Sequence, residues 1–84
     1  MTLFRWETST RYYQAMLLQD LLGDLIVHKS WGGVGQATGG SETIVVESTE
    51  HGLVVIAEIE KRRLHRGYKR ISFYPDFLPK SSII

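Results

Sequence analysis

One tryptophan and the glycines after it are the residues of this sequence best suited to chemistry. Residues 28–40 are HKSWGGVGQATGG, so Trp31 ends an apolar, strand-like run and five glycines follow within nine residues. A tryptophan beside backbone this free to bend can stand exposed as a flat aromatic contact surface. The alternative is architectural: Trp31 covers the sheet, and the glycines form a flexible hairpin with Gly35 at positive φ.

The glycines do not form a nucleotide-binding loop. Gly33 and Gly35 give G-x-G, but the next glycine, Gly39, comes one place too late for G-x-G-x-x-G. The following residues, ETIVVES, are typical of a strand and not of the helix that would hold a pyrophosphate. We therefore expect no nucleotide cofactor.

The remaining polar residues show no catalytic or metal-binding pattern. His28, His51 and His65 lack the spacing of metal ligands, and no signature of a nucleophile with its base is present. We expect a protein that is not an enzyme and that holds no metal or cofactor.

Positive charge is concentrated near the C-terminus. Residues 1–60 carry three Lys/Arg against eight Asp/Glu, a net of −5, whereas residues 61–84 carry seven against one, a net of +6. Residues 61–70, KRRLHRGYKR, contain six cations and no acid. This cluster is either a footprint for a polyanion or the solvated end of a helix whose dipole it matches.

Length and composition indicate one globular domain. The chain has 84 residues, 43% of them hydrophobic and 11% aromatic. It has no cysteine, which fits a reducing, cytoplasmic setting. No apolar run approaches the ~20 residues of a membrane span, and Arg5 and Glu7 interrupt any signal peptide. We expect no contact with a membrane.

Alternating or β-branched residues predict four strands, at residues 3–9, 12–20, 25–31 and 42–48, with a break at Thr10 and Arg11. Residues 68–74 are a candidate for a fifth strand, at the edge of the sheet. The third strand would present Leu25, Val27, Lys29 and Trp31 on one face.

The apolar residues change from a spacing of two to spacings of three and four, which predicts one helix at residues 48–66. Ser48 suits the N-cap and Gly67 suits the position after the C-cap. Leu53, Ile56 and Ile59 form its apolar stripe. Val54 and Val55 would then point away from the sheet, as a contact surface for a protein partner.

These elements predict an α+β fold: a twisted antiparallel sheet of four to five strands with one helix packed on a face. The domain would cover residues 1–76, followed by a loose tail at 77–84.

The residues around Trp31 resemble a known family. KSWGGVG (29–35) is similar to the motif of the WGR domain, named for Trp-Gly-Arg, which occurs in DNA-dependent poly(ADP-ribose) polymerases and in bacterial proteins. The resemblance covers about residues 2–75 in the expected order, including the Ser-capped helix and the Gly-Tyr pair after it. It implies the same fold and contact with DNA.

The resemblance also implies a set of site residues. Trp31 matches the motif tryptophan, which packs against a DNA strand end in the polymerases, and Gly33 stands where the family has arginine. Lys29 is the nearest cation left. The expected nucleic-acid contacts are Lys29, Trp31, Gly32, Gly33, Arg62, Arg66, Lys69 and Arg70. We expect a stand-alone, non-catalytic module that engages DNA backbone or strand ends non-specifically. The alternative is a protein-interaction module that uses Val54 and Val55.

Overall fold

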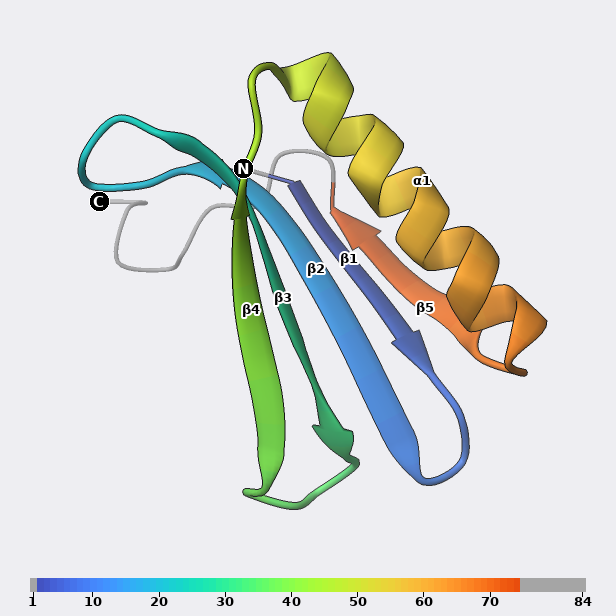
Figure 1. The fold of residues 1–84 in the computed structure, drawn as a ribbon. Helices are drawn as coiled ribbons and strands as arrows, with labels where there is room; N and C mark the ends of the chain where they lie inside the picture. Colours follow the sequence, from blue (N-terminus) through green and yellow to red (C-terminus); the bar gives the residue numbers. More distant parts are fainter. Residues whose placement is uncertain (1, 75–84) are drawn as a thin grey trace.

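The protein folds into one antiparallel sheet with one helix across it (Figure 1). The structure, a computed structural model, describes residues 2–74. Its elements are β1 Thr2–Glu7, β2 Arg11–Gln19, β3 Leu25–Gly33, β4 Gly39–Val45, α1 Thr49–His65 and β5 Lys69–Tyr74. The strand order is β4-β3-β2-β1-β5. The predicted α+β fold is confirmed; the predicted boundary at 76 and the tail at 77–84 lie outside the described residues.

One row of cross-strand partners runs across all five strands. In register, Arg70 of β5 lies opposite Trp6, Trp6 opposite Tyr13, Tyr13 opposite Trp31, and Trp31 opposite Gly40. Directly opposed residues share a face of the sheet. Because Trp6 of this row donates a hydrogen bond to Glu60 of α1, the row lies on the side that α1 covers.

The strands extend further into the glycine-rich segment than predicted. β3 continues through Gly33 and β4 begins at Gly39, so that only residues 34–38 connect them. Cross-strand pairing decides this, since Gly32 pairs with both Tyr12 and Gly39. Gly35 has φ 75°, as expected of a turn glycine. Arg11, predicted to lie in a break, is the first residue of β2.

The core lies between the sheet and the helix. Its buried cluster comprises Phe4, Trp6, Ala15, Leu17, Val27, Val46, Ile56 and Tyr68. Trp6 is fully buried, and its indole Nε1 donates a hydrogen bond to Glu60 Oε1 at 3.2 Å. Of the two tryptophans, Trp6 is the one that builds the core.

The predicted helix ends are confirmed. Ser48 is the N-cap, and its hydroxyl accepts a hydrogen bond from the His51 N–H at 3.0 Å. At the other end Gly67 has φ 88°, and the Tyr68 N–H bonds to the Arg63 carbonyl at 3.0 Å. This six-residue closure is the Schellman motif, which only a residue with easy positive φ allows. It brings Tyr68 back beside Arg63.

The face that α1 turns to the sheet differs from the prediction. Gly52 and Ile56 are buried, and Val55 and Ile59 pack against the core, whereas Leu53 is 43% exposed. A Cβ on Gly52 would lie 2.5 Å from Leu17 Cδ1, so the missing side chain lets the helix sit close to β2 at this point. The assignment of Val55 to an outward surface is therefore wrong, while Val54 is 60% exposed.

Among residues 2–74, α1 has neither the length nor the hydropathy to cross a membrane.

Candidate nucleic-acid interface

Four aromatic rings form a continuous row on the helix-facing side of the sheet. Phe4 stacks on Trp6 with ring centroids 5.9 Å apart, and Trp6 meets Tyr13 edge-on at 6.2 Å. Tyr13 then stacks on Trp31 at 5.7 Å with an interplanar angle of 16°. Burial falls along the row, from the fully buried Trp6 to the half-buried Trp31. Trp31 is thus anchored to the core through Tyr13 and remains partly open to solvent.

The glycine opposite Trp31 makes room for its ring. A Cβ on Gly40 would lie 2.7 Å from Trp31 Cζ2 and 2.9 Å from Nε1. Any other residue at position 40 would push the indole away from β4. Gly40 lies opposite Trp31 across the β3–β4 pair, and its missing side chain leaves the space that the indole occupies.

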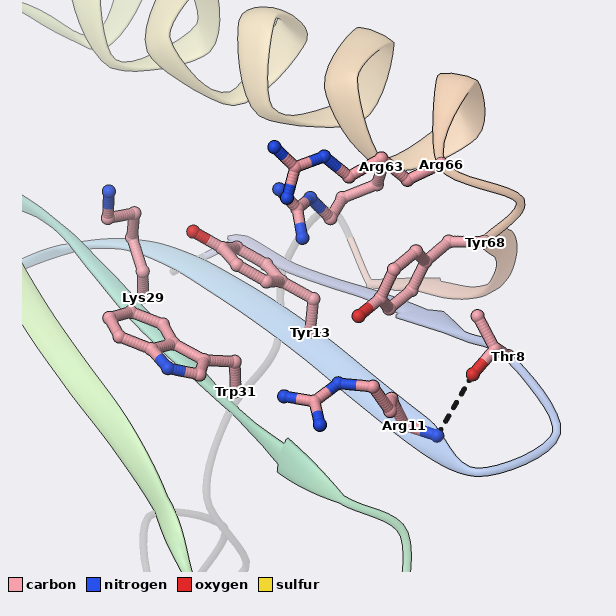
Figure 2. Close-up of a pocket in the computed structure, with 8 residues that line it drawn as sticks. All are labelled: Thr8, Arg11, Tyr13, Lys29, Trp31, Arg63, Arg66 and Tyr68. Carbon is pink, nitrogen blue, oxygen red and sulfur yellow. Dashed lines mark hydrogen bonds between the residues drawn. The ribbon is translucent and has the colours of Figure 1, made fainter.

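The outer end of this row opens into a groove of about 520 Å³ between the sheet and the C-terminal end of α1. Its lining residues are Thr8, Arg11, Tyr13, Lys29, Trp31, Arg63, Arg66 and Tyr68 (Figure 2). Three of these are aromatic and four are cationic. Within residues 2–74, no Asp or Glu is among the side chains that line it.

Arg63 is a partly buried cation of the groove that lies against two aromatic rings. Its guanidinium lies 4.5 Å from the centroid of the Tyr13 ring and 5.2 Å from that of Tyr68. Its Nε is buried and has no hydrogen-bond partner among the described residues. Burying a charged donor without an acceptor is unfavourable. An anion in the groove would pair with the positive charge of this guanidinium.

The other three cations surround the aromatic rings. Figure 2 shows Arg63 and Arg66 reaching from the helix end over Tyr13 and Tyr68, and Lys29 and Arg11 rising from the sheet on either side of Trp31. Lys29 is partly neutralised, because its Nζ lies 3.2 Å from Glu42 Oε1 and its side chain is only 18% exposed. Arg11 and Arg66 are exposed.

The structure brings together only part of the predicted site. Lys29, Trp31 and Arg66 line the groove. Gly32 is buried between β2 and β4, and Gly33 pairs with Arg11 at the end of the sheet. Neither glycine belongs to a loose loop, contrary to expectation, because the sheet extends through both.

The predicted basic cluster is divided between several surfaces. Arg62 does not line the groove; it borders two other hollows, one with Glu58, Lys61 and His65 and one that includes Lys29. Lys69 borders a separate hollow with Glu7 and Ser9. Arg70 Nη1 lies 3.2 Å from Glu60 Oε1, the same oxygen that accepts from Trp6. The helix turn therefore directs Arg63 and Arg66, and not Arg62, at the groove.

Five of the eight lining residues were not predicted as ligand contacts: Thr8, Arg11, Tyr13, Arg63 and Tyr68. Two signals could have found some of them. Arg11 and Tyr13 alternate with Ala15 on one strand face, and Arg63 and Arg66 are three apart on one helix face. Tyr68 needed the Schellman closure, which depends on three-dimensional contacts.

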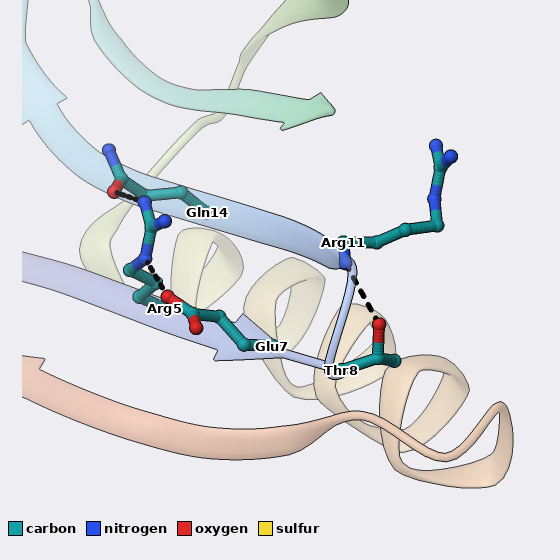
Figure 3. Close-up of polar contacts among 5 residues, drawn as sticks. All are labelled: Arg5, Glu7, Thr8, Arg11 and Gln14. Carbon is teal, nitrogen blue, oxygen red and sulfur yellow. Dashed lines mark hydrogen bonds and ion pairs between the residues drawn. The ribbon is translucent and has the colours of Figure 1, made fainter. Parts of the chain in front are cut away.

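The remaining strand arginine, Arg5, belongs to the opposite face of the sheet. Its Nε lies 2.8 Å from Glu7 Oε2, its Nη1 donates to Gln14 Oε1 at 3.2 Å, and its guanidinium lies 4.5 Å from the Tyr12 centroid (Figure 3). Arg5 is therefore fully engaged on the side away from the groove.

No group of three or more His, Cys, Asp or Glu that could hold a metal occurs within the part of the chain that the structure describes.

Comparisons of the chain with protein-family models, with curated proteins and with solved structures found no match. The WGR resemblance therefore stays a prediction from the sequence.

Proposed function

We propose that this protein is a non-catalytic binding module that engages nucleic acid, DNA in the first instance, through the groove at the C-terminal end of α1. The proposal depends on the residues that line the groove. Three of them are aromatic and four are cationic, and none of the described lining residues is Asp or Glu. Bases and sugars stack on aromatic rings, and phosphates are held by cations. The resemblance to the WGR domain supports the same proposal.

Each part of the groove has a distinct role in this proposal. The exposed part of the Trp31 indole receives a base or sugar, with Tyr13 behind it as a rigid support. Arg11 and Arg66 hold backbone phosphates, and the Arg63 guanidinium donates to a phosphate oxygen from its place between two rings. These contacts address the backbone and the faces of the bases, so binding would be insensitive to sequence.

A titration of labelled single-stranded and blunt duplex DNA, followed by fluorescence anisotropy, tests the proposal. We expect dissociation constants in the range of ~10⁻⁴–10⁻⁶ M, as for non-specific binding. The binding constant should fall with salt concentration as expected when about two to four phosphates are neutralised. Absence of binding at low salt to either DNA would reject it.

Tryptophan fluorescence gives an independent readout. Stacking on Trp31 should quench its emission on addition of unlabelled DNA, while the fully buried Trp6 contributes a constant background. Trp31→Phe keeps an aromatic ring and should remove the quenching. Quenching that persists in Trp31→Phe would assign the signal to Trp6 and contradict stacking at Trp31.

The alternative function, a protein-interaction module, keeps one of its two predicted contacts. Val54 is exposed beside the exposed Leu53 on the outer face of α1, whereas Val55 packs against the core. If the DNA titration fails, the Leu53–Val54 surface becomes the leading candidate site.

A further inference from the structure

The hairpin between β2 and β3 ends in two leucines that lie in solvent. Leu21 is 104% exposed and Leu22 is 88% exposed. Single exposed apolar residues are common on proteins, but two adjacent leucines at the tip of a hairpin form a protruding apolar surface. We define the tip as residues 20–24.

The tip has a fixed shape. The Asp20 carboxylate accepts hydrogen bonds from the N–H groups of Leu22 and Asp24, at 3.0 and 2.8 Å. The Asp20 N–H bonds to the Asp24 carbonyl at 2.8 Å, and Gln19 Nε2 donates to the Gly23 carbonyl at 3.0 Å. Gly23 has φ 89°, which the turn requires. Because the loop is already ordered, docking it would lose little conformational entropy.

The surroundings of the tip are acidic. Asp24 is exposed. The Val46 N–H donates a hydrogen bond to the Leu25 carbonyl, so the segment with Glu47 and Glu50 starts at the same end of the sheet. An anionic lipid surface would repel this end. Two leucines among carboxylates fit a pocket with apolar walls and a cationic rim.

The groove at the opposite end of the molecule has these properties. Its walls are the rings of Tyr13, Trp31 and Tyr68, and its rim carries Arg11 and Arg66. Strand β2 runs from Arg11 at the groove to Gln19 at the tip, nine residues that span roughly 27 Å at 3.3 Å per residue. In Figure 1 the β2–β3 hairpin and the C-terminal end of α1 lie at opposite ends of the molecule, so a molecule cannot fill its own groove with its own tip.

We propose that the tip of one copy docks in the groove of a second copy, Leu21 and Leu22 against the aromatic walls and Asp24 toward Arg11 and Arg66. The two surfaces are different, so the contact is heterologous and continues from copy to copy. The tip is small, so association is weak and reversible. Self-association and nucleic acid then compete for the groove. The inference rests on the groove but not on its binding of DNA.

Sedimentation velocity over a concentration series at low salt, without nucleic acid, tests the proposal. The wild-type sedimentation coefficient should rise with concentration. The variant Leu21→Ser/Leu22→Ser removes the apolar side chains of the tip. The variant Arg11→Glu/Arg66→Glu removes the positive charges at the rim of the groove. All four residues are exposed, so both variants should fold. Each variant alone should stay monomeric. Their mixture should form 1:1 dimers, because the first supplies an intact groove and the second an intact tip.

The matched control is Leu53→Ser/Val54→Ser, which removes an exposed apolar pair from α1 and should associate like the wild type. A wild type that stays monomeric at all concentrations, association that survives Leu21→Ser/Leu22→Ser, or a mixture that does not pair would each overturn the proposal.

DNA titrations separate this proposal from the proposed function. Leu21→Ser/Leu22→Ser should bind DNA as well as the wild type, and DNA should dissociate wild-type assemblies. Association without any DNA binding would reject the nucleic-acid function alone.

Discussion

Arg11 and Gly33 lie directly opposite each other across the β2–β3 ladder. Opposed residues share a face of the sheet, so the Arg11 side chain rises on the face that an arginine at position 33 would use. Gly33 stands where the WGR domain, which the sequence resembles, has arginine. Arg11, on the neighbouring strand, places a guanidinium at the same end of the groove.

This relationship predicts a rescue. Arg11→Ala should weaken DNA binding, and Gly33→Arg in that background should restore most of the loss by returning a cation to the groove. A Cβ on Gly33 would meet Gln36 Oε1 at 2.7 Å, a contact with a flexible side chain that can move. Anisotropy titrations of the single and double variants measure the effect. Equal affinity of the double variant and Arg11→Ala would contradict the equivalence of the two positions.

Trp31→Ala should separate binding from stability. We expect a loss of ~1–3 kcal/mol in DNA binding, the range for one stack on an aromatic ring. The free energy of unfolding should fall by about 1–2 kcal/mol, because the half-buried indole loses its stacking on Tyr13.

Trp6→Ala is the matched control for the core. It removes a fully buried ring and leaves Glu60 without its indole donor, so it should destabilise by ~3–5 kcal/mol or more. Thermal melts of the two variants compare them. A Trp31→Ala variant as unstable as Trp6→Ala would make Trp31 a core residue.

Arg66 and Arg62 form a matched pair, since both are exposed arginines near the end of α1 and only Arg66 lines the groove. Arg66→Ala should reduce the slope of log K against log salt by about 0.9 for duplex DNA, the loss of one phosphate contact. Arg62→Ala should leave the slope unchanged. Equal effects would mean that DNA uses the helix surface and not the groove.

Gly40→Val tests whether DNA binding depends on the position of the Trp31 indole. A Cβ at position 40 would lie 2.7 Å from Trp31 Cζ2, so the ring must leave its place and DNA affinity should fall about as far as in Trp31→Ala, by ~1–3 kcal/mol. Ser41→Val is the control, because Ser41 is exposed and adjacent residues of a strand point to opposite faces. Unchanged DNA binding by Gly40→Val would show that the position of the indole does not matter.

Val54→Asp and Val55→Asp should differ sharply in stability. Val54 is 60% exposed, so its substitution should change the free energy of unfolding by less than about 0.5 kcal/mol. Val55 packs against the core, and an aspartate there would bury a charge or expose the core, which we expect to destabilise by at least ~2 kcal/mol. Chemical denaturation of both variants decides whether the helix is rotated as described.

Much of the fold was predictable because it depends on local chemistry. The alternating strands, the Ser48 cap and the Gly67 terminus follow from side-chain period and from backbone preferences within a few residues. The shared face of Lys29 and Trp31 was predictable for the same reason, since successive strand residues point to opposite sides.

The helix rotation was not predictable from its apolar residues, because a glycine decided it. Gly52 contributes no hydrophobic side chain to a sequence pattern, but its missing Cβ permits the close contact with Leu17 that turns Leu53 outward and Val55 inward. Packing selects among helix faces by shape as well as by hydrophobicity.

The α+β elements, the cationic helix end and the place of Trp31 on a strand follow from the residues and their spacing. Their convergence on one groove, with Arg11 and Tyr13 from β2, Trp31 from β3, and Arg63 and Arg66 from α1, appears only in the folded chain. The physical reason is that strand register and helix rotation are set by contacts between residues far apart in the chain, which local periodicity does not record.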